Sequence, residues 1–355
     1  LALLLVGAVS LVRGPENLVG DGLSQIPTPQ GGYTNIKSDE LAQMLKSKSF
    51  YLVNVHIPYA GEIEGTDAKI PYNEVYVVPA VGNSANASVA ASRLGLKSAL
   101  VSNVGGDYFG KECLDALAAE KVSTEFVKVH RGVKTNYHYV LWYEDDRTIL
   151  IKHERYPYKL PNVGEPSWIY FSSLGGNSEA FHKIVLAYLK KHPKIKLAFQ
   201  PGTFQMKMGR KKLAGIYARS EVVICNKEEA QRILGTSENN VKILLKKMHD
   251  IGPKIVVITD GPKGAYASDG KLAWFMPPYP DPKPPLERTG AGDAFSSTFV
   301  VALCCGRSVP EALEWAPINS MSVVQHVGAR EGLLTRKQLE AYLRKAPRSY
   351  RPERI

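Results

Sequence analysis

Residues 288–306 read Arg-Thr-Gly-Ala-Gly-Asp-Ala-Phe-Ser-Ser-Thr-Phe-Val-Val-Ala-Leu-Cys-Cys-Gly, a glycine-rich turn followed by a long apolar run. The run from 296 to 305 has the composition of a helix buried nearly all round, and Gly306 predicts its end. The small residues of its first turn let a ligand approach backbone N–H groups at the positive end of the helix dipole. Asp293 lies there and can accept a proton from a hydroxyl that attacks a bound phosphate. The alternative is a glycine-rich turn in which Asp293 helps to cap the helix.

A regular alternation of strands and helices surrounds this stretch, from about residue 74 to residue 342. Amphipathic stretches such as 180–191 and 241–250 separate short apolar runs that have the composition of buried strands. This pattern predicts βαβ units, so we expect an α/β fold with a mostly parallel central sheet and helices on both faces. The strand-like runs are 98–102, 168–172, 195–199, 221–225 and 254–259.

A second group of strand-like runs is aromatic and alternating, at 75–78, 136–143 and 147–152, with a hairpin turn at 144–146. We expect lid strands at about 74–79 and 135–152, in a small antiparallel sheet beside the main domain. Asn136 and His138 are two residues apart and so lie on the same face of their strand. This face points either at a substrate or at solvent.

The N-terminal residues follow a different pattern. The apolar run 1–12 is too short to span a bilayer and fits either a remnant of a signal peptide or a buried strand that ends at 6–7. We treat 1–32 as an apolar segment and linker. Residues 33–73 resemble the first half of a rhodanese-like domain, but no cysteine lies between 66 and 113 to serve as its nucleophile, so we expect no sulfurtransferase activity. The main domain then covers 74–345, and 346–355 form a tail.

Composition restricts the partners and the compartment. The 355 residues include 45 Lys and Arg against 34 Asp and Glu, a formal net charge of +11. The basic residues are spread along the chain without a nucleic-acid motif, which favours a solvated basic surface, so we expect neither a nucleic-acid nor a membrane partner. The four cysteines are too few and too irregularly spaced for a disulfide scaffold or a zinc site, which favours a reducing, cytoplasmic compartment. They are Cys113, Cys225, Cys304 and Cys305.

The segment 289–295 resembles the C-terminal signature of the PfkB (ribokinase-like) carbohydrate kinases, Asp-Thr-x-Gly-Ala-Gly-Asp. The resemblance implies a ribokinase-like fold, with Asp293 as the catalytic base. It also implies that backbone N–H groups form an anion hole for the transferring phosphoryl group. Glu287 stands where the family usually has Asp, a position that helps to hold a monovalent cation such as K⁺ in many members. The residues of the implied anion hole are Gly290, Ala291, Gly292 and Asp293.

Further segments follow the order of the family's motifs over about 250 residues. The segment 81–86 resembles the N-terminal signature, which implies that Gly82, Asn83 and Asn86 contact sugar hydroxyls; the alternative is an Asn-capped helix packed through its alanines. Asn226-Lys-Glu-Glu229 has the pattern of a helix capping box. By resemblance, Glu229 would also hold metal-bound water and Asn226 would lie near the nucleotide.

The resemblance also implies an ATP-binding turn at 259–264 and a pocket around the adenine. Thr259, Gly261 and Gly264 would lie near the ribose and phosphates, although such glycines are also common in hairpins. Asn319 matches a helix position beside the adenine, and 328–329 match the turn that closes the pocket.

Together these observations predict an ATP-dependent kinase that transfers the γ-phosphate to a hydroxyl of a sugar or nucleoside, with ATP and Mg²⁺ as cofactors. The alternative is an inactive or regulatory nucleotide-binding member of the same family, since Val81, Glu287 and the N-terminus depart from the pattern. Two arrangements of the N-terminus remain open, namely a domain inserted after an unusual first strand and a fusion of fragments. Because family members often pair through the lid, we also expect a homodimer.

Overall fold

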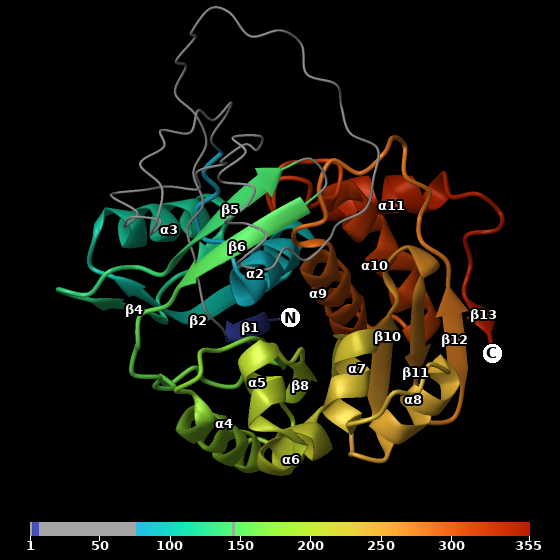
Figure 1. The fold of residues 1–355 in the computed structure, drawn as a ribbon, viewed down its shortest axis with the longest axis horizontal. Helices are drawn as coiled ribbons and strands as arrows, with labels where there is room; N and C mark the ends of the chain where they lie inside the picture. The colour runs from blue at the N-terminus through green and yellow to red at the C-terminus, as the bar shows by residue number, and fades with distance from the viewer. Residues whose placement is uncertain (1, 7–75, 144–145) are drawn as a thin grey trace, which may run out of the picture.

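One large sheet organises the structure. The computed structural model describes residues 2–6, 76–143 and 146–355. Within this part of the chain, eleven strands form a sheet in the order β13-β12-β11-β10-β9-β8-β7-β1-β2-β3, and β4 also pairs with β2 (Figure 1). The neighbours from β10 to β3 are parallel, whereas β11, β12 and β13 extend the sheet in antiparallel fashion. The strands are β1 (Ala2–Val6), β2 (Lys97–Gly105), β3 (Val122–Ser123), β4 (Val127–His130), β7 (Trp168–Phe171), β8 (Lys196–Phe199), β9 (Val222–Asn226), β10 (Ile255–Thr259), β11 (Ala265–Ser268), β12 (Ala273–Met276) and β13 (Glu353–Arg354).

Helices cover both faces of this sheet, which confirms the predicted α/β fold. One face carries α2 (Asn83–Arg93), α3 (Tyr108–Ala119), α9 (Ala291–Cys304), α10 (Val309–Val323) and α11 (Arg336–Arg344). The other face carries α4 (Glu179–Lys191), α6 (Arg210–Arg219), α7 (Lys227–Leu234) and α8 (Val241–His249), and the short helix α5 (Thr203–Met208) packs beside them (Figure 1).

The side-chain alternation of a central strand explains the two layers of helices. All four residues of β7 are buried. Trp168 and Tyr170 join the core on the α9 side, whereas Ile169 and Phe171 join the core on the α4 side. A strand buried on both faces needs a continuous apolar run, which is the pattern that predicts it in the sequence.

The N-terminal strand β1 occupies the middle of the sheet. It lies parallel to β2 on one side and to β7 on the other, with Leu3 opposite Ser98 and Trp168. The sheet therefore includes five residues of the segment 1–32 that the sequence separates from the main domain. The linker, the segment 33–73 and the connection between them lie outside the described residues.

A two-stranded hairpin forms the lid. β5 (Tyr137–Tyr143) pairs with β6 (Asp146–Lys152) in antiparallel register, and Figure 1 shows the hairpin in front of α2. We also expected a third lid strand at about 74–79. This prediction is wrong for residues 76–79, the part that the structure describes, because they form no strand. Ala80 and Gly82 have φ values of +55° and +120°, so the chain turns sharply into α2 and cannot extend a strand there. No helix of the described residues is long and apolar enough to cross a membrane.

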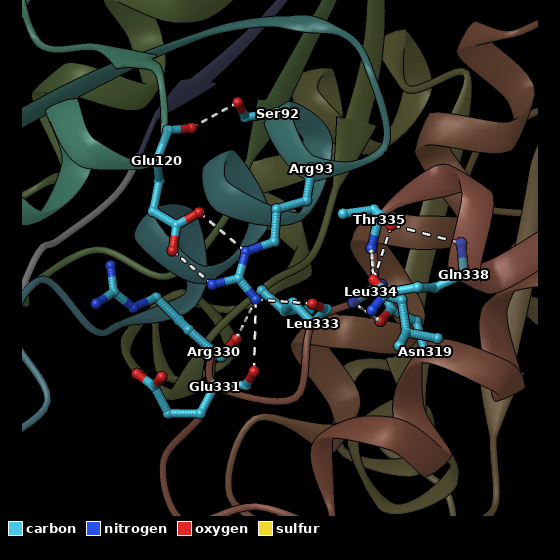
Figure 2. A network of polar contacts seen from close by, with 10 residues as sticks. All are labelled: Ser92, Arg93, Glu120, Asn319, Arg330, Glu331, Leu333, Leu334, Thr335 and Gln338. Carbon is cyan, nitrogen blue, oxygen red and sulfur yellow. Dashed lines mark hydrogen bonds and ion pairs between the residues drawn. The ribbon is translucent and has the colours of Figure 1, made fainter.

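An arginine clamp fixes the loop 328–334 against α2 and α3 (Figure 2). Arg93, in the last turn of α2, donates from Nε and Nη2 to the Glu120 carboxylate at 2.9 and 2.5 Å. Its Nη1 donates to the carbonyls of Arg330 and Leu333 at 3.1 and 2.7 Å. One guanidinium therefore joins the ends of two helices to a loop more than 230 residues away in sequence.

We expect Glu120→Gln to lower the free energy of unfolding by about 1–3 kcal/mol at neutral pH, because it removes the charge from a two-pronged ion pair. The hydrogen bond from Arg93 lowers the pKa of Glu120, and burial opposes this only in part. The pKa of Glu120 is therefore lower in the folded protein than in the unfolded chain, where it is about 4.3. The ion pair stabilises the fold fully above about pH 4.3, and this stabilisation is lost as the pH falls through the pKa of the folded protein. The difference in melting temperature between wild type and variant should therefore shrink below about pH 4.

Glu340→Gln is the matched control for this measurement. Glu340 pairs with Arg336 along α11, and both side chains are more exposed than those of Arg93 and Glu120. Exposed pairs of this spacing contribute about 0.3–0.5 kcal/mol. Equal losses in the two variants, or a loss at Glu120 that does not change with pH, would contradict the clamp.

Candidate active site

Asp293 lies in the first turn of α9. The helix begins after Gly290, whose φ of +82° lies in the left-handed region that favours glycine. A Cβ at Gly290 would lie 2.6 Å from the Cα of Ala329, so the loop 328–334 packs directly against the start of the helix. Asp293 is only 9% exposed. Its carboxylate is thus a nearly buried charge at the positive end of the helix dipole.

Three side-chain amides surround this carboxylate. Asn83 Nδ2 donates to Oδ1 at 2.6 Å, and Asn86 Nδ2 donates to Oδ2 at 2.8 Å. Both asparagines lie in the first turn of α2, three residues apart and hence on one face, with Gly82 as the N-cap residue. Gln200, which follows β8, donates from Nε2 to Oδ1 at 3.3 Å. The structure therefore brings the expected base together with the expected acceptor-binding residues.

The pKa of Asp293 reflects a balance of opposing effects. Burial raises it, because desolvation disfavours the charged form, and the hydrogen bonds from Asn86, Asn83 and Gln200 lower it in that order. Burial has the larger effect, so the pKa lies above the ordinary value of an aspartate. The amides thus partly offset the cost of keeping a buried base ionised.

Asn226 and Glu229 form the capping box that the sequence predicts at the start of α7. Asn226 Oδ1 accepts from the Glu229 backbone N–H at 2.8 Å, and Glu229 Oε2 accepts from the Asn226 N–H at 2.9 Å. Burial raises the pKa of Glu229, and the negative charge of Asp293 raises it further. The two carboxylates therefore act on each other across the site.

This arrangement fits a Mg²⁺ ion that is held through water and phosphate oxygens. The described residues contain no group of three or more His, Cys, Asp or Glu side chains that could hold a metal ion by themselves. Glu229 is a half-buried carboxylate that feels the charge of a second one, and a cation between them would relieve their repulsion. Mg²⁺ commonly keeps several waters and takes one or two carboxylates plus substrate phosphates.

A cavity of about 370 Å³ opens beside the start of α9. Three predicted cofactor residues line it, namely Thr259, Gly261 and Gly264 at the end of β10, and so do Ala291 and Gly292. The start of a helix thus shares a cavity with a glycine-containing turn, which suits a ligand that carries phosphates. Apolar side chains from α9 and α10 complete the wall: Phe295, Pro317, Met321 and Val324.

Asn319 lies next to this cavity but does not line it. Its side chain is fully buried, with Nδ2 donating to Thr298 Oγ1 at 2.8 Å and Oδ1 accepting from the Leu334 N–H at 2.9 Å. The neighbouring residue Ser320 lines the cavity instead. Asn319 on α10 therefore joins α9 to the loop 328–334, and Figure 2 shows its contact with Leu334.

Glu287 is tied to the same loop. Its side chain is 4% exposed, and Oε1 accepts a hydrogen bond from the Gly328 backbone N–H. The adjacent backbone is held as well, because the Leu286 N–H donates to the Val324 carbonyl at 2.8 Å. The position at which the family usually has Asp therefore anchors the loop that packs against Gly290.

The sequence analysis missed Gln200 and Tyr170. Gln200 touches Asp293 directly, and the Tyr170 hydroxyl donates to Gln200 Oε1. Gln200 had a usable signal, since it is a polar residue directly after the carboxyl end of a buried parallel strand, where α/β sheets bind ligands. Tyr170 had no such signal, because it lies inside an apolar run and its hydroxyl contacts a residue that follows the neighbouring strand β8.

Comparison with known proteins assigns most of the chain to a family. The family model for pfkB family carbohydrate kinases matches residues 56–336. This match begins inside the segment 33–73, so it assigns residues 56–73 to the kinase family, and nothing supports the rhodanese-like interpretation.

Curated relatives act on several kinds of acceptor. The chain is 28% identical over 269 residues to the ATP-dependent 6-phosphofructokinase of Thermoanaerobacterium thermosaccharolyticum, covering 70% of this chain and 80% of the relative. It is 23% identical over 277 residues to the ribokinase of Bacillus subtilis, covering 74% and 87%. It is 28% identical over 256 residues to the cytidine kinase of Thermococcus kodakarensis, covering 70% and 88%.

Solved structures share the fold. Arabidopsis thaliana ribokinase, complexed with ribose and ATP, superimposes with a TM-score of 0.71 at 19% identity over 96% of this chain and 98% of the other. A putative ribokinase II from E. coli, in complex with ATP and Mg²⁺, gives a TM-score of 0.65 at 17% identity over 97% and 99%. At these identities the similarity establishes a ribokinase-like fold.

Two glycines at the start of α9 provide a contrasting pair of variants. A Cβ at Gly292 meets no atom within 4 Å, so Gly292→Ala should keep the melting temperature of the wild type. Because Gly292 lines the cavity, its methyl group should keep phosphates away from the backbone N–H groups and weaken ATP binding by about 10-fold or more.

Gly290→Ala should instead destabilise the fold by about 1–3 kcal/mol or more, because alanine is strained at a positive φ and its Cβ would clash with Ala329. Thermal unfolding and calorimetric titration with ATP measure the two effects separately. Wild-type ATP affinity in Gly292→Ala would show that this helix start does not bind phosphate.

Proposed function

Because the chain belongs to the pfkB family of carbohydrate kinases, we propose that it transfers the γ-phosphoryl group of ATP, with Mg²⁺, to a hydroxyl group of a sugar or nucleoside. The observation that carries this proposal is the position of Asp293. Its carboxylate is nearly buried at the start of α9 and is held by amides from α2. It lies beside the cavity that the start of α9 shares with the glycine-containing turn after β10.

In the proposed reaction the acceptor oxygen attacks the γ-phosphorus, and the bond to the oxygen that bridges the β- and γ-phosphorus breaks, so that ADP leaves. The proton of the acceptor hydroxyl passes to the carboxylate of Asp293. Ala291 and Gly292 line the cavity at the helix start, and in this scheme backbone N–H groups of that turn stabilise the negative charge of the transferring group. Mg²⁺, when bound near Glu229, supplies positive charge for the phosphates.

Asn86 supports a polyhydroxylated acceptor. Its Nδ2 donates to Asp293, whereas its Oδ1 is buried and has no hydrogen-bond partner among the residues that the structure describes. An unpaired buried oxygen is costly, and a hydroxyl group is a donor that can satisfy it. An acceptor hydroxyl that donates to Asn86 Oδ1 would be held next to the Asp293 carboxylate. Asn83 and Gly82 lie in the same turn, within reach of neighbouring hydroxyls.

The setting of the enzyme is part of the same proposal. All four cysteines are free thiols, which supports a reducing, cytoplasmic compartment. A homodimer through the lid is supported by Leu150 on β6, which is 45% exposed on a two-stranded hairpin. A monovalent cation such as K⁺ rests on the family resemblance, with Glu287 near the start of α9.

Phosphate transfer from ATP and Mg²⁺ to a panel of pentoses, hexoses, sugar phosphates and nucleosides tests the proposal. We expect acceptor-dependent ADP formation that falls about 10³-fold or more in Asp293→Asn, because an amide cannot accept the proton. Asp115→Asn is the matched control, since Asp115 is exposed on α3 in an ion pair with Lys111. The assay is run in K⁺ and in choline to measure the cation dependence.

Two results would overturn the proposal. If Asp293→Asn keeps wild-type turnover, Asp293 is not the base. If ATP stabilises the protein against heat but no acceptor is phosphorylated, the inactive or regulatory alternative is favoured.

A further inference from the structure

A chain of two hydrogen bonds reaches Asp293 from β7 and from the end of β8. The Tyr170 hydroxyl, on β7, donates to Oε1 of Gln200, and Gln200 Nε2 donates to Oδ1 of Asp293 at 3.3 Å. Tyr170 is completely buried, and the Gln200 backbone N–H is bonded to the Phe171 carbonyl at 2.9 Å. Both ends of the Gln200 side chain are therefore engaged, and its backbone is fixed on β7.

The direction of these hydrogen bonds is determined by their end groups. An ionised carboxylate only accepts, so the amide must turn its NH₂ group toward Asp293. The amide oxygen then faces Tyr170 and needs a donor, which the phenol provides. Burial and the negative charge of Asp293 raise the pKa of Tyr170 well above its ordinary value, so the phenol remains a donor throughout the neutral range. Tyr170 thus prevents the amide from flipping and placing its oxygen against the carboxylate.

The consequence is an asymmetry between the two oxygens of Asp293. Oδ1 accepts from both Asn83 and Gln200, which matches the usual capacity of two lone pairs. Oδ2 accepts from Asn86 among the described residues, and this leaves it one lone pair. The acceptor hydroxyl can therefore give its proton most readily to Oδ2, which also lies beside the unpaired Oδ1 of Asn86.

We propose that Gln200 and Tyr170 are positioning residues that saturate Oδ1 of Asp293 and thereby direct Oδ2 to the acceptor hydroxyl. This inference rests on the proposed function. In the transfer step the O–H bond of the acceptor breaks as its oxygen bonds to the γ-phosphorus. The proton goes to Oδ2, and the bridging oxygen leaves with ADP. Gln200 takes no proton in this scheme, and Tyr170 acts only through Gln200.

We call the two hydrogen bonds from Tyr170 through Gln200 to Asp293 the relay. Gln200→Met and Tyr170→Phe test it, because they remove the amide and the hydroxyl group with little change in side-chain volume. Loss of the Gln200 donor disfavours the charged form of Asp293, so its pKa should rise and the acid limb of the kcat profile should move to higher pH by about one pH unit. We expect kcat to fall about 10-fold, with a KM for ATP within about 2-fold of wild type.

Tyr170→Phe should shift the acid limb in the same direction by less. In the Gln200→Met background it should have no further effect on the pH profile, since the amide through which it acts on Asp293 is already absent and its other contact, with Ser296, does not involve this amide. Tyr217→Phe is the matched control, because Tyr217 is a buried phenol on the α4 side of the sheet that stacks edge-on against Phe199. This control should leave the pH profile unchanged.

The carbon-13 titration of the Asp293 carboxyl, assigned with Asp293→Asn, measures its pKa without any turnover. A rise of this pKa in Gln200→Met supports the relay even in a protein that phosphorylates none of the acceptors, so failure of the proposed function is distinguished from failure of this inference. Three results would overturn it. These are an unchanged Asp293 pKa in Gln200→Met, a higher KM for ATP with an unchanged pH profile, and a Tyr170→Phe effect of equal size with and without Gln200.

Discussion

The burial of the Asp293 carboxylate is the constraint on which the rest of the site depends. A charge that is only 9% exposed is stable only where dipoles and donors replace the water it has lost. The start of α9 supplies the helix dipole, α2 supplies two amides and the end of β8 supplies a third. Because the dipole and the donors come from three separate elements, the carboxylate can be satisfied only when the sheet and both helices are assembled. Burial still keeps the pKa raised, as suits a group that must take up a proton.

The parallel sheet explains how distant residues meet at this point. Strands that run in the same direction place their carboxyl ends along one edge, so Gln200 after β8, Asn226 at the end of β9 and Thr259 at the end of β10 lie at the same edge of the sheet. The loop 328–334 closes this edge against Gly290. It is held from one side by Arg93 and from the other by Asn319, both through hydrogen bonds to or from its backbone. Stability and function are linked here, because the contacts that fix the loop also shape the start of α9.

Local signals in the sequence predicted the parts of the site that local physics determines. The glycine-rich turn before α9 and the Asn226–Glu229 capping box depend on neighbours within a few residues, so their patterns are visible in the chain. The five parallel strands after residue 74 were predicted because double-sided burial requires continuous apolar runs. Gln200 and Tyr170 were missed because their roles arise from contacts between elements, with 93 residues separating Gln200 from Asp293. The lid strand expected at 74–79 was wrong in its described part because a turn at Ala80 overrides the β-branched composition before it.

The proposed function assigns phosphoryl transfer and the choice of acceptor to different elements. The part of the cavity proposed to hold the phosphates is lined by small residues at the start of α9 and after β10, namely Ala291, Gly292, Gly261 and Gly264. The groups proposed to contact the acceptor are side chains of α2, which also hold Asp293, and the β5–β6 hairpin lies in front of this helix (Figure 1). Side chains can be exchanged without moving a backbone, so one transfer site can serve different acceptors. This division agrees with the relatives of the chain, which include a 6-phosphofructokinase, a ribokinase and a cytidine kinase on one common architecture. Differences in acceptor should therefore map to the hairpin and to the surroundings of α2, while Asp293 and the glycine-rich start of α9 stay constant.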